Sequence, residues 1–321
     1  MRRATARERA GEGSTERRSS FPEARVDDYQ LVVERALARA GRVVLIGGLD
    51  AGKTSLARRL LRAALDVGRS PALLDCDLGQ KSVGPPASVG MKLIRSPDDL
   101  EPDRLAGADA ISFVGATSPQ GHLLPLIAGV ASLSGRAREQ GADFLVVDTS
   151  GLVSGVYGQT LKFHKLEVLR PSLAIGLQRG GELDPLLGIA NRFFSMDVIA
   201  LPVASEIVPT SVEQRAANRE RAMRRYFADP LQRYRVKPTV FMPALPALFE
   251  LDELDRLLVG LSDGAGEYVG MGYVEHSPED GVLRLITPIA EAPRALRLGS
   301  IRLGEDFRAK RVDLRNLFGT D

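Results

Sequence analysis

Short apolar runs alternate with amphipathic stretches along the first two thirds of the chain. Apolar runs of four or five residues, several of them rich in β-branched side chains, predict buried strands at 42–46, 71–75, 110–114, 144–148, 173–177 and 198–201. Apolar residues at helical spacing predict helices over about 29–40, 53–67 and 123–138. Strands that alternate with helices are typical of a mainly parallel sheet covered by helices on both faces. The pattern therefore predicts an α/β fold.

The pattern changes after about residue 235. Pro238, Pro243 and Pro246 punctuate a linker, and short strand-like runs follow at 257–259, 268–274, 283–286 and 296–301. Asp-Gly pairs at 263–264 and 280–281 supply turns between them. We therefore predict a larger domain over 29–236 and a small β-rich domain over 237–321. The first 28 residues are rich in Arg, Glu, Ser and Gly, which predicts a disordered tail.

Composition narrows the classes of function. With 321 residues and 44% hydrophobic content, the chain can bury one large core and a smaller one. The net charge of +2 provides no global basic field, so any nucleic-acid contact must come from a local patch. One cysteine excludes a disulfide framework and predicts a reducing, cytoplasmic compartment. No apolar run of about 18 residues and no secretory signal occur, so we expect no membrane partner.

A glycine-rich turn lies between the first predicted strand and the helix that follows it. Its G-x-x-x-x-G-K-[ST] pattern lets backbone N–H groups face phosphate oxygens, and the helix N-terminus adds favourable partial charge. We expect Lys53 to reach the β- and γ-phosphates and the Thr54 hydroxyl to ligate Mg²⁺. The turn therefore predicts an ATP and Mg²⁺ site formed by Gly47, Gly48, Leu49, Asp50, Ala51, Gly52, Lys53, Thr54 and Ser55.

Three classes of P-loop protein compete for this pattern. A GTPase needs a guanine-reading N-K-x-D motif after a late strand, and the chain has none. The segment 177–184 lies where that motif would be, which argues against a GTPase without proving ATP. A motor or remodelling ATPase would need an Arg finger from a neighbouring subunit. A kinase needs a base near the acceptor hydroxyl and a mobile cationic lid.

Acidic residues end two of the predicted strands. Asp75 and Asp77 follow the second strand and Asp148 ends the fourth. The carboxyl ends of parallel strands face the ligand crevice, so Asp77 can accept a proton from an attacking hydroxyl or hold the Mg²⁺ water shell. Gln80 can orient the acceptor or a water. Either Asp77 or Asp148 can be the main carboxylate beside Mg²⁺, together with Thr54.

A helix over about 209–228 is predicted to form the lid. Ser211 and Gln214 fit a capping box at its start. Arg215 and Arg219 are four residues apart and share one face. They can clamp the transferring phosphoryl group, or they can lie on a solvated face with glutamates of the same helix. We favour the lid because a phosphotransferase needs such cations.

In this order, the motifs resemble the polynucleotide 5′-hydroxyl kinase family. The family includes the eukaryotic RNA-end kinases of pre-mRNA 3′-end, tRNA and ribosomal RNA processing, and archaeal and bacterial relatives. The resemblance runs from about residue 43 to 226. Besides the glycine turn with its aspartate, its marks are the D-x-x-Q of 77–80, the segments 113–122 and 147–153, and the R-x-x-x-R of 215–219. The glycine turn is common, but the ordered combination is specific.

The resemblance implies an enzyme that phosphorylates the 5′-hydroxyl end of RNA or DNA with ATP. It implies that Lys53 acts on ATP and that Asp77 activates the 5′-hydroxyl. Gln80 would position the substrate or the metal shell. Arg215 and Arg219 would form the lid over the phosphates. The implied partner is a nucleic acid with a 5′-OH end, and the motifs leave the choice of RNA or DNA open.

Two further segments are candidates for substrate contacts. The resemblance places a clasp for the 5′ nucleotide at 84–88, where Pro85 and Pro86 stand in place of a T-P-G-like sequence of the eukaryotic members. Thr117 and Ser118 end the third predicted strand in the same crevice. They can donate hydrogen bonds to a nucleotide phosphate or cap the following helix.

For other polar and aromatic residues near these motifs, the sequence gives less specific predictions. Lys162 and Lys165 can touch substrate phosphates or lie on a solvated face. Tyr226 and Phe227 are predicted to pack in a core at the base of the lid rather than to stack on a base. His122 is predicted to pack on or near the helix that follows the third strand, outside catalysis.

Two alternatives to a kinase remain open. The chain can be a non-catalytic ATP-binding scaffold in RNA processing, although intact Lys53, Asp77 and Gln80 argue against that. It can also be a P-loop NTPase switch for metal or cofactor insertion, which the absence of a Cys/His cluster disfavours. Large members of the resembled family carry a β-rich domain before the P-loop. Only about forty residues precede it here, so we do not expect partner docking through such a domain.

Overall fold

The computed structural model describes residues 28–39, 41–228, 230–279 and 281–319. The predicted disordered tail lies outside these residues, apart from its last position. Within the described ranges, no helix is long and apolar enough to cross a membrane.

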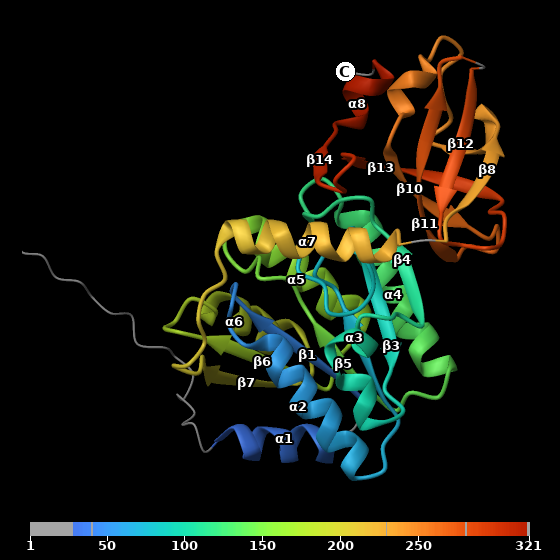
Figure 1. Ribbon diagram of the computed structural model, residues 1–321. Coiled ribbons are helices and arrows are strands. Elements are labelled where there is room, and N and C mark those ends of the chain that lie inside the picture. The colour runs from blue at the N-terminus through green and yellow to red at the C-terminus, as the bar shows by residue number, and fades with distance from the viewer. Residues whose placement is uncertain (1–27, 40, 229, 280, 320–321) are drawn as a thin grey trace, which may run out of the picture.

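The larger unit holds the first strands and helices of the chain (Figure 1). Its strands are β1 (Gly41–Gly47), β2 (Pro71–Asp75), β3 (Ser88–Leu93), β4 (Ala110–Phe113), β5 (Phe144–Asp148), β6 (Leu173–Gln178) and β7 (Asp197–Pro202). Its helices are α1 (Asp28–Ala38), α2 (Lys53–Asp66), α3 (Pro102–Leu105), α4 (Leu123–Glu139), α5 (Gly155–Leu169), α6 (Asp184–Phe193) and α7 (Val212–Tyr226).

The sheet of this unit is mainly parallel, which confirms the predicted α/β class. Strands β2, β5, β1, β6 and β7 are neighbours in that order, and each adjacent pair runs parallel. Strand β3, which the hydrophobic pattern did not predict, runs antiparallel between β2 and β4. The carboxyl ends of β1, β2 and β5 therefore share one edge, where the glycine turn and the acidic residues lie.

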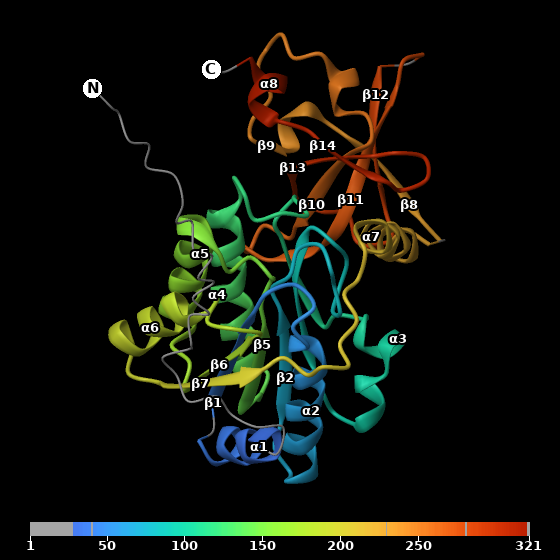
Figure 2. The same cartoon turned by 90° about the vertical axis from the view of Figure 1, so that its left-hand side faces the viewer.

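Helices cover both faces of the sheet (Figure 2). Val44 and Ile46 of β1 face a core that they share with α4, α5 and α6. Val43 and Leu45 face the opposite core, which they share with α1 and α2. Successive side chains of a strand point to opposite faces, so a strand that is apolar throughout requires a helical layer on each side. Two cores hold the sheet rigid beneath its functional edge.

The C-terminal unit is a mainly antiparallel sheet. It contains β8 (Gln232–Val236), β9 (Phe241–Met242), β10 (Leu257–Ser262), β11 (Tyr268–Ser277), β12 (Val282–Thr287), β13 (Ala295–Leu303), β14 (Ala309–Arg311) and the short helix α8 (Leu314–Phe318). Strand β8 lies ahead of residue 237 and pairs with β12. We therefore propose that this unit begins with β8.

The two units share a core and a strand contact. Tyr268 of β11 pairs with Ile111 of β4, which joins the two sheets edge to edge. Helix α7 lies across the top of the larger unit, directly below the C-terminal unit (Figure 1). Phe227, just after α7, is 3% exposed, and its ring lies 5.4 Å from that of Tyr273 and stacks at 5.7 Å on Phe307. This confirms the predicted core packing of Phe227 at the base of the lid.

Candidate active site

The glycine turn forms a tightly curled loop between β1 and α2. Asp50 and Gly52 both have left-handed backbone conformations, with φ of 49° and 83°. A Cβ atom on Gly52 would lie 2.6 Å from the Cδ1 atom of Ile207. Position 52 thus requires a positive φ and leaves no room for a side chain. Glycine meets both requirements, because it has no Cβ atom and adopts positive φ without strain. The loop thus presents its backbone N–H groups at the start of α2, as phosphate binding requires.

Lys53 lies over this loop with its ammonium held by the loop itself. Its Nζ atom donates to the carbonyl oxygens of Gly47 at 3.0 Å and Gly48 at 2.6 Å. Burial lowers the pKa of Lys53, and the nearby carboxylates of Asp148 and Asp77 partly oppose that shift. The cation is therefore preoriented in a partly dry site, where its interaction with a phosphate is stronger than in water.

Thr54 and Asp148 come together from α2 and the end of β5. The Thr54 hydroxyl donates to Oδ2 of Asp148 at 2.7 Å. Asp148 is only 6% exposed, and burial, with the nearby negative charge of Asp75, raises its pKa to about 6. The charge of Lys53 and the Thr54 hydrogen bond lower the pKa, but less strongly. The two oxygen donors are those that a Mg²⁺ ion with bound phosphates prefers.

Asp77 has one carboxylate oxygen engaged and one available. Its Oδ1 atom accepts hydrogen bonds from the backbone N–H groups of Gly79 at 2.8 Å and Gln80 at 2.9 Å. Oδ2 accepts none within the described part of the chain. The side chain of Gln80 donates from Nε2 to the carbonyl oxygen of Arg215 at 3.1 Å, so it links the loop after β2 to the lid.

Asp75 has a structural position, in contrast to Asp77. Its buried carboxylate accepts from the backbone N–H groups of Ser82 and Val83, at 2.6 Å and 3.0 Å. Lys81 forms an ion pair with it at 3.2 Å, and both side chains are nearly inaccessible to solvent. Asp75 therefore holds the loop that presents Asp77.

The lid helix begins with the predicted capping box, since Ser211 and Gln214 exchange side-chain and backbone hydrogen bonds. Arg215 forms an ion pair with Asp50 of the glycine turn, with Nη1 and Oδ2 3.1 Å apart. Arg219 lies beside Gly79, since a Cβ there would be 3.7 Å from its Cδ atom. The side chain of Arg219 has no hydrogen bond or ion pair among residues 28–39, 41–228, 230–279 and 281–319, so its guanidinium is available for a ligand.

Most of the predicted catalytic and metal-binding residues line one cavity of about 240 Å³. It lies at the carboxyl edge of the sheet and is lined by Lys53, Thr54, Asp77, Gln80, Asp148 and Arg215, and by Leu49–Gly52 and Ser55 of the glycine turn. No group of three or more His, Cys, Asp or Glu side chains that could hold a metal occurs among the described residues. A cation here would therefore need phosphate oxygens as further ligands, as Mg²⁺ in phosphotransferases has.

The predicted substrate residues are more dispersed. Pro85 lines a second, larger cavity, whereas Pro86 is buried and lines neither of these two cavities. The carbonyl of Thr117 lies near Gly79, and Ser118 is exposed. Helix α4 is capped at His122, so the alternative that Thr117 or Ser118 caps it is wrong.

Lys162 and Lys165 of α5 are fully buried, so the alternative of a solvated face is wrong. The Nζ of Lys162 donates to the carbonyl oxygen of Ser150 at 2.7 Å, and that of Lys165 to the carbonyl oxygen of Cys76 at 3.5 Å. Burial lowers the pKa of both lysines. Their long apolar stems cross the core while their heads reach the backbone that follows β5 and β2. They support the two strand ends that carry Asp148 and Asp77.

A second hollow beside the glycine turn was not predicted. It has a volume of about 300 Å³ and lies at the carboxyl ends of β6 and β7, lined by Gln178, Arg179, Pro202–Ser205 and Ile207. Arg179 ties it to the turn by donating from Nη2 to the carbonyl oxygen of Asp50 at 2.6 Å. The sequence contained one indication of this cavity, because the predicted parallel strands β6 and β7 end at the same edge of the sheet as β1.

The comparison with known families agrees with this geometry. The sequence model of the family described as mRNA cleavage and polyadenylation factor CLP1 P-loop matches residues 47–229, more than half of the chain. The chain belongs to the CLP1 P-loop family. Membership implies ATP binding, and the match spans the segment from the glycine turn to the lid helix.

Several curated relatives of this chain are kinases by name. The polyribonucleotide 5′-hydroxyl-kinase of Pyrococcus abyssi is 32% identical over 206 residues, which cover 62% of this chain and 55% of that protein. The kinase of the same name from Pyrococcus horikoshii is 26% identical over 341 residues, covering 87% and 91%. The aligned region is thus about half of the first relative and most of the second.

A solved CLP1 structure has the same fold. Wild-type Clp1p in its complex with Pcf11p superposes with a TM-score of 0.69 at 14% identity, covering 86% of this chain and 78% of that one. At this identity the likeness establishes the architecture alone. It extends well beyond the residues that the family model matches.

Proposed function

We propose that this chain transfers the γ-phosphoryl group of ATP to the 5′-hydroxyl end of RNA. The observation that carries the proposal is that Lys53, Asp77 and the Thr54–Asp148 pair line one cavity beside a lid arginine. RNA is favoured over DNA because the similar archaeal proteins are named polyribonucleotide kinases. The single cysteine fits a reducing, cytoplasmic setting.

ATP occupies two adjacent parts of the site in this proposal. The backbone N–H groups of the glycine turn and Lys53 bind the phosphates. The hollow at the ends of β6 and β7 takes the adenine, since Arg179 joins it directly to the turn. Thr54 and Asp148 would hold Mg²⁺, which supplies neutralisation of charge on the phosphates when bound.

The transfer itself is an in-line displacement. The free Oδ2 of Asp77 takes the proton of the 5′-hydroxyl, and the hydroxyl oxygen forms the new bond to the γ-phosphorus. The bond from that phosphorus to the β–γ bridging oxygen breaks, and ADP leaves. Gln80 lies in the same loop as Asp77, and its side chain orients the acceptor hydroxyl. Most of the rate acceleration comes from positioning of the two reactants and from neutralisation of charge on the phosphates.

The proposal gives Arg215 two alternative partners, Asp50 and the γ-phosphate of ATP. In the structure it pairs with Asp50 of the glycine turn at 3.1 Å. When ATP is bound, the γ-phosphate competes with Asp50 for the guanidinium, because bidentate Arg–phosphate pairs are among the strong charge-assisted contacts. Arg219, free of protein partners in the described ranges, joins it. The lid then covers the transferring group.

The test is a labelling assay with γ-labelled ATP and a 5′-OH oligoribonucleotide. Asp77→Asn and Lys53→Met should each lower the transfer rate by about 100-fold or more, because each removes a group that acts on the reacting atoms. Asp77→Asn should still bind ATP. The exposed Asp98 is a matched control, and Asp98→Asn should label at the parental rate.

Labelling by both site variants at the parental rate would contradict the assignment. ATP binding with no transfer by the parental chain would instead favour the non-catalytic scaffold. A matched DNA oligonucleotide in the same assay tests the preference for RNA.

A further inference from the structure

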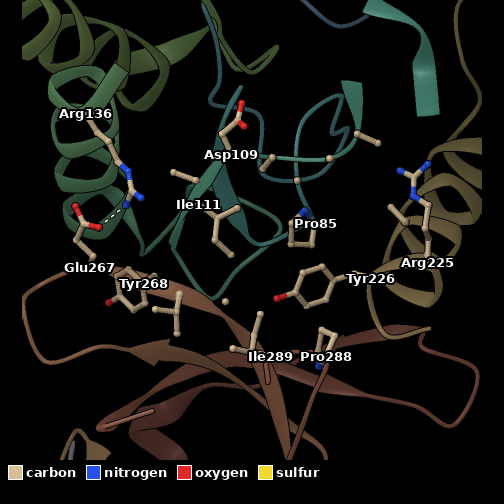
Figure 3. Close-up of a pocket in the computed structure, with 18 of the residues that line it drawn as sticks. Pro85, Asp109, Ile111, Arg136, Arg225, Tyr226, Glu267, Tyr268, Pro288 and Ile289 are labelled. Carbon is tan, nitrogen blue, oxygen red and sulfur yellow. Dashed lines mark hydrogen bonds and ion pairs between the residues drawn. The ribbon is translucent and has the colours of Figure 1, made fainter. Parts of the chain in front are cut away.

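A larger cavity lies between the two units, where β4 meets β11 (Figure 3). Its volume is about 640 Å³, within the usual range of small-ligand sites. Both units contribute to its walls. The residues that matter here are Pro85 and Ile111 from the larger unit, Tyr226 from the end of α7, and Tyr268, Pro288 and Ile289 from the C-terminal unit.

The walls are mostly apolar and aromatic, and the charged side chains among them each have an ion-pair partner: Asp103, Asp109, Arg136, Arg225 and Glu267. The hydroxyl of Tyr226 accepts from the backbone N–H of Met271 at 2.7 Å. The hydroxyl of Tyr268 accepts from Nη1 of Arg297 at 3.1 Å. Both hydroxyls are thus engaged by the protein, and the rings remain as contact surface. Such a site suits a flat, partly apolar group.

A groove connects this cavity to the active site. It has a volume of about 440 Å³ and shares Asp50, Thr54 and Gln80 with the active-site cavity. At its other end it shares Ala222 and Arg225 with the cavity between the units. Helix α7 runs alongside, and the ten residue steps from Arg215 to Arg225 rise about 15 Å along its axis. The path is therefore continuous and follows the lid.

Charge divides the path into two kinds of environment. Arg221 lines the groove and has no ion pair among the described residues, and Arg225 has only a 3.8 Å pair with Asp103 in which both side chains are largely exposed. An exposed pair of this kind is weak and can be exchanged for a phosphate. Arg136 of the cavity, in contrast, is already paired with Glu267 (Figure 3). The groove fits phosphates, and the cavity fits an uncharged ring.

We propose that the cavity between the units binds a nucleobase of the substrate strand, downstream of the end that is phosphorylated. Arg221 and Arg225 contact the phosphates that connect this base to the active site. The inference rests on the proposed function and deepens it. Bases stack on aromatic side chains without strong sequence preference, so the cavity distinguishes a polynucleotide from a single nucleotide. The enzyme therefore selects acceptors by length.

The test compares acceptors of increasing length, from a 5′-OH dinucleotide to a decanucleotide. The KM of the parental enzyme should fall once the strand is long enough to reach the cavity. Tyr268→Ala should raise the KM of the decanucleotide by roughly tenfold, since it removes a stacking surface. The KM of the dinucleotide and of ATP should not change. Tyr268→Phe keeps the ring and should match the parental enzyme.

A second variant covers the case in which Tyr268→Ala does not fold. Val269 lies at the rim and is 39% exposed, so Val269→Glu places a carboxylate there without altering the core. It should also raise only the KM of long acceptors, while the similarly sized Val269→Gln has a smaller effect. In the parental enzyme, an abasic residue at one internal position should raise the KM as Tyr268→Ala does.

Three results overturn the inference. The first is a KM of the parental enzyme that does not depend on length. The second is an equal effect of the variants on the dinucleotide and the decanucleotide. The third is a free nucleoside monophosphate that changes the rate with the dinucleotide, which would assign the cavity to an effector. If the parental enzyme phosphorylates no acceptor at all, the proposed function itself fails, which is a distinct outcome.

Discussion

At the scale of single residues, the site contains a carboxylic acid, Asp148, whose ionised form is disfavoured by its surroundings. Asp148 is buried beside Thr54 and close to the negative charge of Asp75, and its pKa is raised to about 6. The proposed function gives this acid a role, because the Mg²⁺ ion that we assign to it and Thr54 would need a carboxylate. Without that ion, ionisation of Asp148 opposes folding.

This predicts a pH-dependent gain of stability for Asp148→Asn in the presence of a chelator. An unfolded aspartate loses its proton near pH 4, whereas folded Asp148 keeps it until about pH 6. The free energy of unfolding of the parental protein therefore falls as pH rises through this window, and that of the variant does not share the loss. As the pH rises from about 5 to about 8, the free energy of unfolding of the variant should increase by about 1–2 kcal/mol relative to that of the parental protein.

Urea unfolding at the two pH values measures this difference. The control variant Asp98→Asn, which changes an exposed acid outside the site, should keep the pH dependence of the parental protein. Parallel stability curves for Asp148→Asn and the parent would show that Asp148 ionises normally in the fold.

At the scale of elements, α7 is held in different ways at its two ends. Its N-terminal end depends on the Ser211 capping box and on the Arg215–Asp50 ion pair, both at least partly exposed to solvent. Its C-terminal end is anchored by Met223 and Phe227 in the core between the units. A helix fixed at one end and loosely tied at the other can open over the phosphates without unfolding the molecule.

We predict that Ser211→Ala loosens the lid locally. Loss of an N-cap costs about 1 kcal/mol, so amide hydrogen exchange in the first turn of α7 should become about fivefold faster. The thermal midpoint should barely change, because the far end of the helix carries the packing. Ser132→Ala, the same change on the exposed side of α4, is the control and should alter neither quantity. Equal protection of α7 in both variants would contradict the proposed looseness.

At the scale of the whole molecule, one aromatic residue of β4 packs closely into the junction between the two units. The ring of Phe113 packs against backbone positions of the C-terminal unit at Gly260 and Gly299. A Cβ on Gly260 would lie 2.4 Å from ring atoms of Phe113. Arg297 adds a hydrogen bond to the carbonyl oxygen of Phe113 at 2.8 Å. The absence of side chains at these glycines therefore makes room for the larger unit.

Gly260→Ala should consequently destabilise the junction. Forcing a methyl group into a filled core costs about 1–3 kcal/mol, and the contact with Phe113 leaves little room for relaxation. Gly188→Ala is the matched control, because α6 has open space at that position and alanine favours a helix. Thermal unfolding should give a lower midpoint for Gly260→Ala and an unchanged or higher one for Gly188→Ala. Equal midpoints would show that the junction adapts.

Local sequence patterns predicted most of the elements that bury a regular apolar face, although they missed α6. They missed β3, where Gly90 and Lys92 interrupt the apolar run and two prolines precede it. They also missed α5, because its buried face carries Lys162 and Lys165, which look polar in the sequence. In both cases tertiary contacts with carbonyl groups satisfy the lysine ammonium, and a sequence pattern does not contain that information.

The sequence by itself determined the strand–turn–helix of the phosphate cradle and the acids at the carboxyl edge of the sheet. These features are local, since a glycine turn, a helix start and a strand end depend on neighbouring residues. The tertiary structure alone decided which distant groups meet. Arg215 and Asp50 are 165 positions apart, and the cavity that we assign to a nucleobase is formed by two separate sheets. Such contacts follow from how the units pack together, which local periodicity does not specify.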